Sequence, residues 1–274
     1  MLKIGLSSCG KALDEELFSS YSKSGIDNME LSMKLEGYIT LDFCKVRALA
    51  EKYGINLWSF HLPFEADIDI SNPEYSKSTI ETHKDLIKKA AAIGVKIFVL
   101  HPSAEPIGDG ERALRMNESK KSLVELADFA ESYGATIAVE NLPRTCLGKN
   151  ADEMLELLSA DKRLRACFDT NHLLSGCPIE FIKKLGKKII TTHVSDYDFV
   201  DERHWLPGEG RLDWQGVFKA LISIGYEGTW LYELGFEAPP SIERERALTC
   251  EDFAKNAREI FRGLPLTVLG TPKI

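Results

Sequence analysis

The 274-residue sequence lacks several features that would place it in a familiar class of protein. No apolar run approaches the roughly 20 residues that a membrane helix needs, so we expect no membrane span. The six cysteines contain no Cys-x-x-Cys pair and give no sign of a disulfide framework. No basic and apolar leader precedes the first apolar run. Together these absences predict a reduced, cytoplasmic protein.

Positive charge is also scarce, with 34 Lys and Arg residues against 42 Asp and Glu residues and a formal net charge of −8. Such a chain has no overall attraction to phosphate backbones or to anionic membranes. We therefore expect neither a nucleic-acid nor a membrane partner. A GxGxxG loop is missing after the first apolar run, which argues against an open dinucleotide-binding sheet.

Short runs rich in Ile, Val, Leu, Phe and Trp alternate with longer amphipathic stretches along the chain. Eight runs are predicted to be strands, at residues 3–8, 28–33, 56–61, 96–101, 136–140, 165–169, 189–194 and 229–233. Several of the intervening helical patterns end on a glycine, such as Gly54 and Gly225. Eight strand and helix units of this size are typical of a closed barrel. We predict an α/β fold in which residues 1–274 form a single (β/α)8 TIM barrel domain, with an open doubly wound sheet as the main alternative.

Histidines and carboxylates recur at the ends of the predicted strands. They are His61, His101, Glu140, Asp169, His193 and Glu233. In a barrel these ends meet at one rim, and the longest irregular segments, 63–72, 103–112 and 197–212, follow strands at the same rim. One such residue alone is more often a structural hydrogen-bonding group. Five or more together would cost several kcal/mol per unpaired charge unless a cation compensated them, which predicts a metal site.

Four of these residues, from predicted strands five to eight, form the expected ion cage: Glu140, Asp169, His193 and Glu233. Three carboxylates and one imidazole suit a divalent Mn, Zn, Co or Mg ion and leave positions open for water or substrate oxygens. A closed structural zinc site would contain more thiolates. His83, by contrast, lies on the apolar face of a predicted helix, so we expect it to pack in the core.

Seven longer motifs extend over nearly the whole chain: HLPF from His61, HPS from His101, VENLP around Glu140, DTNH from Asp169, HVSD from His193, HWLPGEG from His204 and YELG around Glu233. Together they resemble those of the xylose isomerase-like barrel superfamily, in the branch of sugar phosphate isomerases, epimerases and endonuclease IV. The resemblance implies that Glu140 and Glu233 bind the metal and also act as the catalytic acid/base pair. The implied enzyme is a divalent-metal-dependent isomerase or epimerase of a small sugar, sugar phosphate or related polyhydroxy carbonyl compound. It would work by proton transfer through an enediolate, with epimerisation favoured over aldose/ketose isomerisation.

Six further side chains are the expected substrate contacts: His61, His101, His172, Arg203, His204 and Trp205. The resemblance implies that His172 holds a substrate oxygen. Arg203 could clamp a polar substrate group, and Trp205 could act as a lid or stack on a sugar. His61 and His101 either line the sugar pocket or hold additional metal. A small carbohydrate is the expected partner, and a homo-oligomer is one option for the quaternary structure.

An endonuclease IV-like, zinc-dependent abasic-site phosphodiesterase is the alternative function, because its three-zinc pattern also aligns with this chain. The possible additional metal ligands would be His61, His101, His172, Glu202 and His204. Glu202 stands where that family has aspartate. The acidic composition and the acids that follow Phe64, at Glu65 and Asp67, argue against DNA binding. We therefore favour the isomerase.

Overall fold

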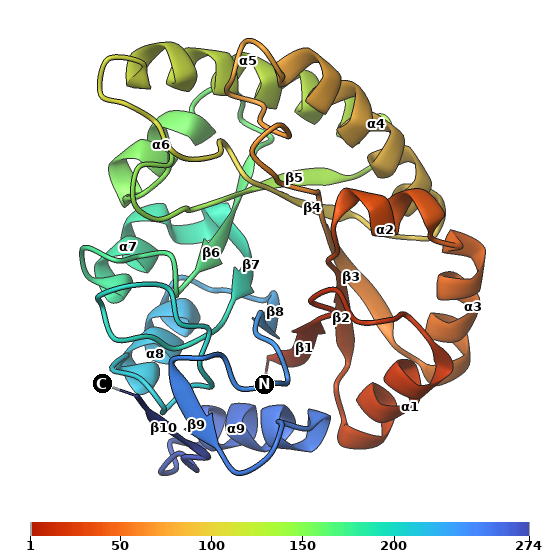
Figure 1. The fold of residues 1–274 in the computed structure, drawn as a ribbon, viewed down its shortest axis with the longest axis vertical. Coiled ribbons are helices and arrows are strands. Elements are labelled where there is room, and N and C mark those ends of the chain that lie inside the picture. Colours follow the sequence, from red (N-terminus) through yellow and green to blue (C-terminus); the bar gives the residue numbers. More distant parts are fainter. Residues whose placement is uncertain (1, 274) are drawn as a thin grey trace.

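The computed structural model describes residues 2–273, in which eight parallel strands form a barrel surrounded by helices (Figure 1). The strands are β1 (Lys3–Ser7), β2 (Asn28–Leu31), β3 (Asn56–His61), β4 (Ile97–Leu100), β5 (Thr136–Glu140), β6 (Arg165–Asp169), β7 (Ile189–His193) and β8 (Thr229–Tyr232). Their order is β7-β6-β5-β4-β3-β2-β1-β8. The barrel closes where the Val194 amide donates to the Leu231 carbonyl at 2.8 Å. The predicted TIM barrel fold is confirmed.

The helices cover the outside of the barrel, with α1 to α3 on the right of Figure 1, α4 and α5 along the top and α6 to α8 on the left. They are α1 (Glu15–Ser24), α2 (Leu35–Thr40), α3 (Phe43–Tyr53), α4 (Ser76–Ala92), α5 (Arg112–Glu131), α6 (Ala151–Leu158), α7 (Pro178–Leu185), the short 3-10 helix η1 (Gly186–Lys188), α8 (Trp214–Ser223) and α9 (Cys250–Arg262). Side-chain caps start several of them: Asp42, for example, accepts from the Lys45 amide at 3.0 Å. Gly54 ends α3 at a φ of 67°, which a residue with a side chain rarely adopts.

The strands form where the sequence predicts them because their residues are buried on both faces, as a strand between helices and a filled barrel requires. Five of them end one or two residues before the predicted end, among them β2 and β8. β2 ends at Leu31 and β8 at Tyr232, so Glu233 is the first residue of the loop that follows. A two-stranded antiparallel sheet, β9 (Ile242–Arg244) and β10 (Gly270–Pro272), was not predicted.

Two buried carboxylates shape the long 197–212 loop. Asp196 accepts from the Gly208 amide and from the Trp214 indole, both at 2.8 Å. Glu209 forms a buried pair with Arg244 of β9, with Nη2 and Oε2 2.6 Å apart. These contacts tie the loop to residues outside it, which gives the loop a defined shape over the barrel rim.

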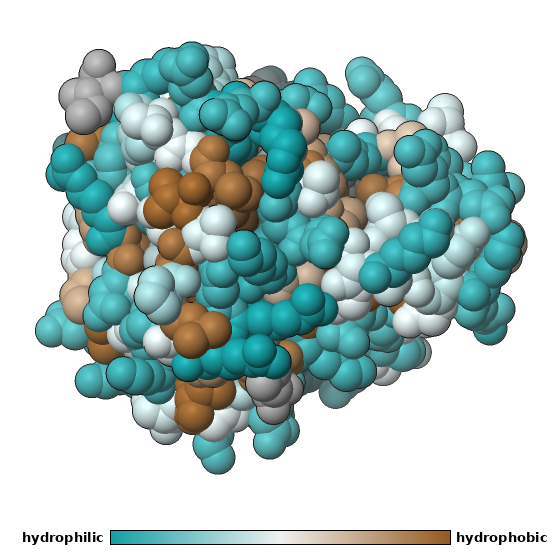
Figure 2. All heavy atoms as spheres, turned by 90° about the horizontal axis from the view of Figure 1, so that it is seen from below, coloured by the Kyte–Doolittle hydropathy of each residue, from teal (hydrophilic) through white to brown (hydrophobic). Residues whose placement is uncertain are grey.

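Apolar side chains on the outer surface are scattered. The face seen from below in Figure 2 carries small separate hydrophobic patches between hydrophilic side chains, so the helices there turn their apolar sides inward. None of the helices within residues 2–273 combines the length and the apolar character that a membrane span needs.

Candidate metal centre and cavity

The barrel brings the four predicted ion ligands together. Glu140, Asp169 and His193 are the last residues of β5, β6 and β7, and Glu233 follows β8. Asp169 pairs directly with His193 in the register of the sheet. One ligand atom from each residue lies within 4.8 Å of the other three. We call these four residues the inner group.

The centre of the inner group is Nδ1 of His193. It lies 3.0 Å from Glu140 Oε1, 3.0 Å from Glu233 Oε2 and 3.8 Å from Asp169 Oδ2. Three carboxylates thus converge on one imidazole nitrogen in a buried place. Such an arrangement of like charges needs a compensating cation or proton.

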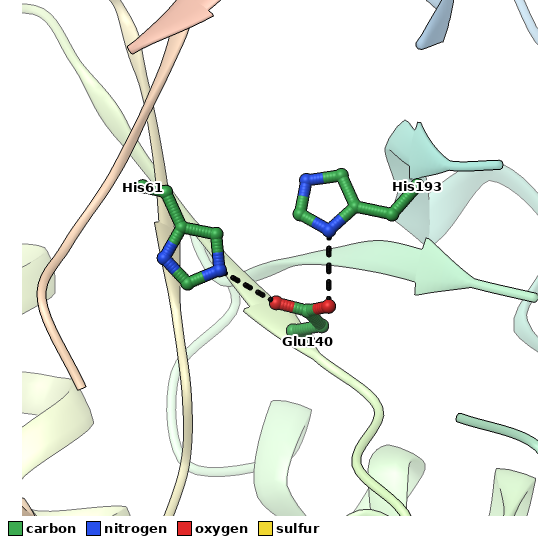
Figure 3. Close-up of side chains that lie close together, drawn as sticks. All are labelled: His61, Glu140 and His193. Atoms are coloured by element: carbon green, nitrogen blue, oxygen red, sulfur yellow. Dashed lines mark hydrogen bonds and ion pairs between the residues drawn. The ribbon is translucent and has the colours of Figure 1, made fainter. Parts of the chain in front are cut away.

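The Glu140 carboxylate is fully buried and enclosed by imidazoles. Oε2 lies 3.1 Å from His61 Nε2 and 3.3 Å from His101 Nε2, whereas Oε1 faces His193 and lies 3.3 Å from His172 Nδ1. Figure 3 shows its two oxygens pointing toward His61 and His193. Burial alone would raise the pKa of Glu140, but these imidazoles hold it well below the usual range. The carboxylate is therefore ionised and shared among several nitrogens.

Asp169 provides the test of whether the inner group fits a metal. Its Oδ1 accepts from the backbone amides of Asn171 at 2.6 Å and His172 at 3.0 Å. Its Oδ2 is buried and has no hydrogen-bond partner. Burial, together with the charges of Glu140 and Glu233, raises the pKa of Asp169 to about 7. This oxygen points into a cluster of three carboxylates and one imidazole and has no hydrogen-bond partner there. Such a set of ligands fits a hard or borderline divalent ion.

Glu30, in β2, belongs to this centre and was not predicted from the sequence. Its buried Oε2 accepts from Ser59 Oγ at 2.8 Å and lies 3.1 Å from His193 Nε2. Because a carboxylate can only accept, Nε2 donates to Glu30, which orients the ring so that Nδ1 faces the inner carboxylates. One signal could have revealed it: a glutamate inside an apolar strand is rarely buried without a partner.

A cavity of about 590 Å³ opens above the inner group, at the carboxyl ends of the strands. Residues that line it include Cys9, Phe64, Glu65, His101, Glu105, Arg144, His172, Glu202, His204 and Glu233. The Phe64 ring stacks on His101, with centroids 3.9 Å apart. The cavity thus has one apolar wall and several polar ones, as ligand sites often do.

The expected substrate contacts separate into two sets. His101, His172 and His204 line the cavity, while His61 lies beneath it, with Nε2 4.0 Å from Glu233 Oε1. Arg203 and Trp205 do not line it, so the placement expected for them is corrected. Arg203 is held by Asp198 at 2.8 Å. Trp205 is 3% exposed, and its indole donates to Ser241, which precedes β9.

A second cluster, which we call the outer group, consists of His172, Glu202 and His204. Glu202 Oε2 lies 3.5 Å from His172 Nε2 and 3.7 Å from His204 Nε2. Nδ1 of each ring faces a backbone carbonyl, that of Asn141 at 3.0 Å and that of Glu233 at 3.2 Å. Burial alone would raise the pKa of Glu202, but the two nearby histidines and the charge of Arg144 lower it. The additional ligands expected for a multi-ion site therefore also lie near one another.

The sequence profile of the xylose isomerase-like TIM barrel family matches residues 18–268. An uncharacterized protein of Methanocaldococcus jannaschii is 31% identical over 83% of this chain and 82% of its own length. The inosose isomerase of Bacillus velezensis is 30% identical over 67% of each chain. The crystal structure of a D-tagatose 3-epimerase-like protein superposes with a TM-score of 0.79 and 24% identity over 96% of both chains. The D-psicose 3-epimerase of Clostridium cellulolyticum H10 superposes with a TM-score of 0.74 and 21% identity, over 96% of this chain and 92% of its own. The chain therefore belongs to the xylose isomerase-like TIM barrel family, as its strand-end motifs predict.

Proposed function

We propose that the protein is a divalent-metal-dependent isomerase or epimerase of a small polyhydroxy carbonyl compound, with the inner group as the metal site. The observation that carries this proposal is the unpaired Asp169 Oδ2 in a buried cluster of three carboxylates and one imidazole, directly below a cavity. The relatives support the reaction class, since they include inosose isomerases and a fructoselysine 3-epimerase that is 29% identical over 48% of this chain. A divalent ion held there would supply Lewis-acid stabilisation of negative charge on substrate oxygens.

Glu233 is the proposed base that faces the substrate. Its side chain lines the cavity and is 15% exposed. Although burial opposes ionisation, the charge and hydrogen bond of His193 lower the pKa of Glu233 to about 2. The carboxylate is therefore ready at neutral pH to take a proton from the carbon next to a carbonyl group, which leaves an enediolate.

Glu140 is the proposed partner of Glu233 in proton transfer. It lies deeper, with a fully buried carboxylate that does not line the cavity and would meet the substrate carbon from beneath the lining. Epimerisation requires a proton to leave one face of the carbon and another to arrive at the opposite face. We propose that the two carboxylates, which lie at different depths, divide these roles, and that His172, which lines the cavity, donates to a substrate oxygen.

The charge of the cavity favours a substrate without phosphate. Its lining contains four carboxylates, and among the described residues Arg144 is the sole lysine or arginine that lines it. Arg144 is already paired with acidic side chains. A phosphate dianion would be repelled, whereas hydroxyl groups can bond to the histidines and a sugar face can pack on Phe64. We therefore propose a free ketose, inosose or similar uncharged compound.

The experiment is proton exchange in deuterated water with free ketoses, inososes and their phosphates. We expect deuterium in the recovered unphosphorylated substrate, with one divalent ion per chain in protein purified without chelator. Glu233→Gln should abolish the exchange, and Glu237→Gln, in the same loop, should leave it unchanged. Metal-free wild type that is equally active, or exchange by Glu233→Gln at the wild-type rate, contradicts the proposal.

Zinc-dependent cleavage of abasic DNA is the second candidate function. The observation in its favour is that His61 and His101 both face Glu140 Oε2 while the outer group lies nearby, so up to three ions could be accommodated. About three zinc ions per chain, with nicking of an abasic duplex, would replace our proposal. One ion without nicking agrees with the isomerase.

A further inference from the structure

Arg144 joins three loops at the rim of the cavity. It follows β5 in a left-handed backbone conformation, with a φ of 51°, which is uncommon for a residue with a side chain. Its guanidinium pairs with Glu105 of the loop after β4 at 2.9 Å, and with Asp201 at 3.0 Å and Glu202 at 2.5 Å in the loop after β7. The side chain is thus fixed in place by acids from two other loops.

Glu202 uses its two oxygens in different directions. Oε1 forms an ion pair with the Arg144 guanidinium but has no aligned hydrogen bond, and Oε2 faces the imidazoles of His172 and His204. The positive charge of Arg144 therefore compensates a carboxylate that is only 20% exposed. Without it, Oε1 would be left without a charged partner.

The outer group otherwise has the geometry of a metal site. Ligands about 2.1 Å from a tetrahedral ion lie about 3.4 Å from one another. The two distances from Glu202 Oε2 to the histidine nitrogens, 3.5 and 3.7 Å, are close to that value. The backbone carbonyls that face Nδ1 of each ring leave Nε2 free to bind an ion.

We propose that Arg144 takes the place of a cation beside Glu202 and thereby keeps the outer group free of metal. The outer group then binds substrate hydroxyls, while the inner group alone holds an ion. This inference rests on the proposed function in assuming one ion in the wild-type protein. Arg144 is a positioning residue in this account, because it acts on substrate and metal through Glu202.

The test counts ions in protein equilibrated with Co²⁺ or Zn²⁺ and freed of unbound metal by gel filtration. We expect one ion per chain in the wild type and two in Arg144→Gln, with the second ion bound at least about tenfold more tightly than by the wild type. Arg144→Lys keeps a positive charge and should stay at one ion. The matched control is Arg163→Gln, because Arg163 also pairs with three acids, Asp128, Glu131 and Asp161, but precedes β6 at the opposite end of the barrel.

The double variant Arg144→Gln/Glu202→Gln should return to one ion, and the visible spectrum of the cobalt protein should report the loss of a histidine-ligated site. A count that stays at one in Arg144→Gln, a second ion in Arg144→Lys, or two or more ions in the wild type overturns the inference. A wild type without any ion refutes the proposed function instead. In that case an ion gained by Arg144→Gln and lost with Glu202→Gln still supports the role of Arg144.

Discussion

Replacing Glu30 by glutamine tests whether the buried carboxylate in β2 prepares His193 for metal binding. Glu30 Oε2 lies 3.1 Å from His193 Nε2, and the opposite ring nitrogen faces the three inner carboxylates. The carboxylate can only accept a hydrogen bond, so it keeps a proton on Nε2 and makes Nδ1 the nitrogen that gives up its proton when an ion binds. An amide can turn its NH2 group toward Nε2, which would place the proton on Nδ1, the proposed ligand atom.

The expected loss follows from the role of such hydrogen bonds. A partner that orients a metal-binding histidine typically contributes about 10–100-fold in metal affinity. We therefore expect Glu30→Gln to weaken metal binding by about 1.4–2.7 kcal/mol. Ser59→Ala, which removes only the hydroxyl donated to Glu30 at 2.8 Å, should cost less.

The measurement is competition for Co²⁺ or Mn²⁺ against a chelator of known affinity, with thermal unfolding to verify that each variant is folded. Glu125→Gln serves as the control, because Glu125 pairs with Lys84 at 2.6 Å on the outer surface and should not affect metal binding. Equal affinities for folded Glu30→Gln and the wild type would refute the reasoning. The orientation of His193 would then be set by packing rather than by its partner.

Three further predictions concern stability. Burial lowers the pKa of His83 to about 4, so the folded protein excludes a proton that the unfolded chain takes up below about pH 6.5. The contribution of His83 to the free energy of unfolding is complete above pH 6.5 and is lost as the pH falls toward 4, by about 2 kcal/mol at pH 5. His83→Gln can still donate to the Pro63 carbonyl. Urea unfolding of this variant at pH 7 and pH 5 should therefore lack the loss seen in the wild type. Arg244→Met should lower the free energy of unfolding by about 3–5 kcal/mol, because it leaves the Glu209 carboxylate buried without its partner. Arg244→Met/Glu209→Leu should recover much of that loss, and a double variant no more stable than the single one would contradict this account. A divalent ion at about 100 times its dissociation constant should stabilise the wild type by about 2.7 kcal/mol in denaturant titrations, and Asp169→Asn should abolish most of that gain.

The sequence predicts the barrel and the inner group well because both follow from local patterns. Each strand is a short apolar run, and parallel strands in a barrel end at one rim, so Asp169 and His193 must lie close together once their strands are placed. The inward placement of His83 in α4 follows from helical periodicity in the same way. No knowledge of loop conformation is needed for these inferences.

The loops are where prediction from the sequence fails. Trp205 was expected in the cavity but is buried, because its loop is folded by Asp196 and by a pair between Glu209 and Arg244, residues 35 positions apart. Glu30 was missed for a different reason. A single charged residue in an apolar run does not reveal that its partner is a histidine 163 positions away.

The same distinction bears on how ions and substrate are selected. The inner group is made of strand ends, whose spacing the barrel fixes, so any chain with these residues should assemble it. The outer group depends on loop conformation, because Glu202 meets His172 only when the 197–212 loop folds over the rim. A guanidinium from a third loop then determines whether the charge of Glu202 is matched by the protein or is available to a metal. If this loop contact sets the number of bound ions, motifs at the strand ends can identify the family and the proposed metal site. A prediction of the substrate must then come from the contacts among the loops after β4, β5 and β7.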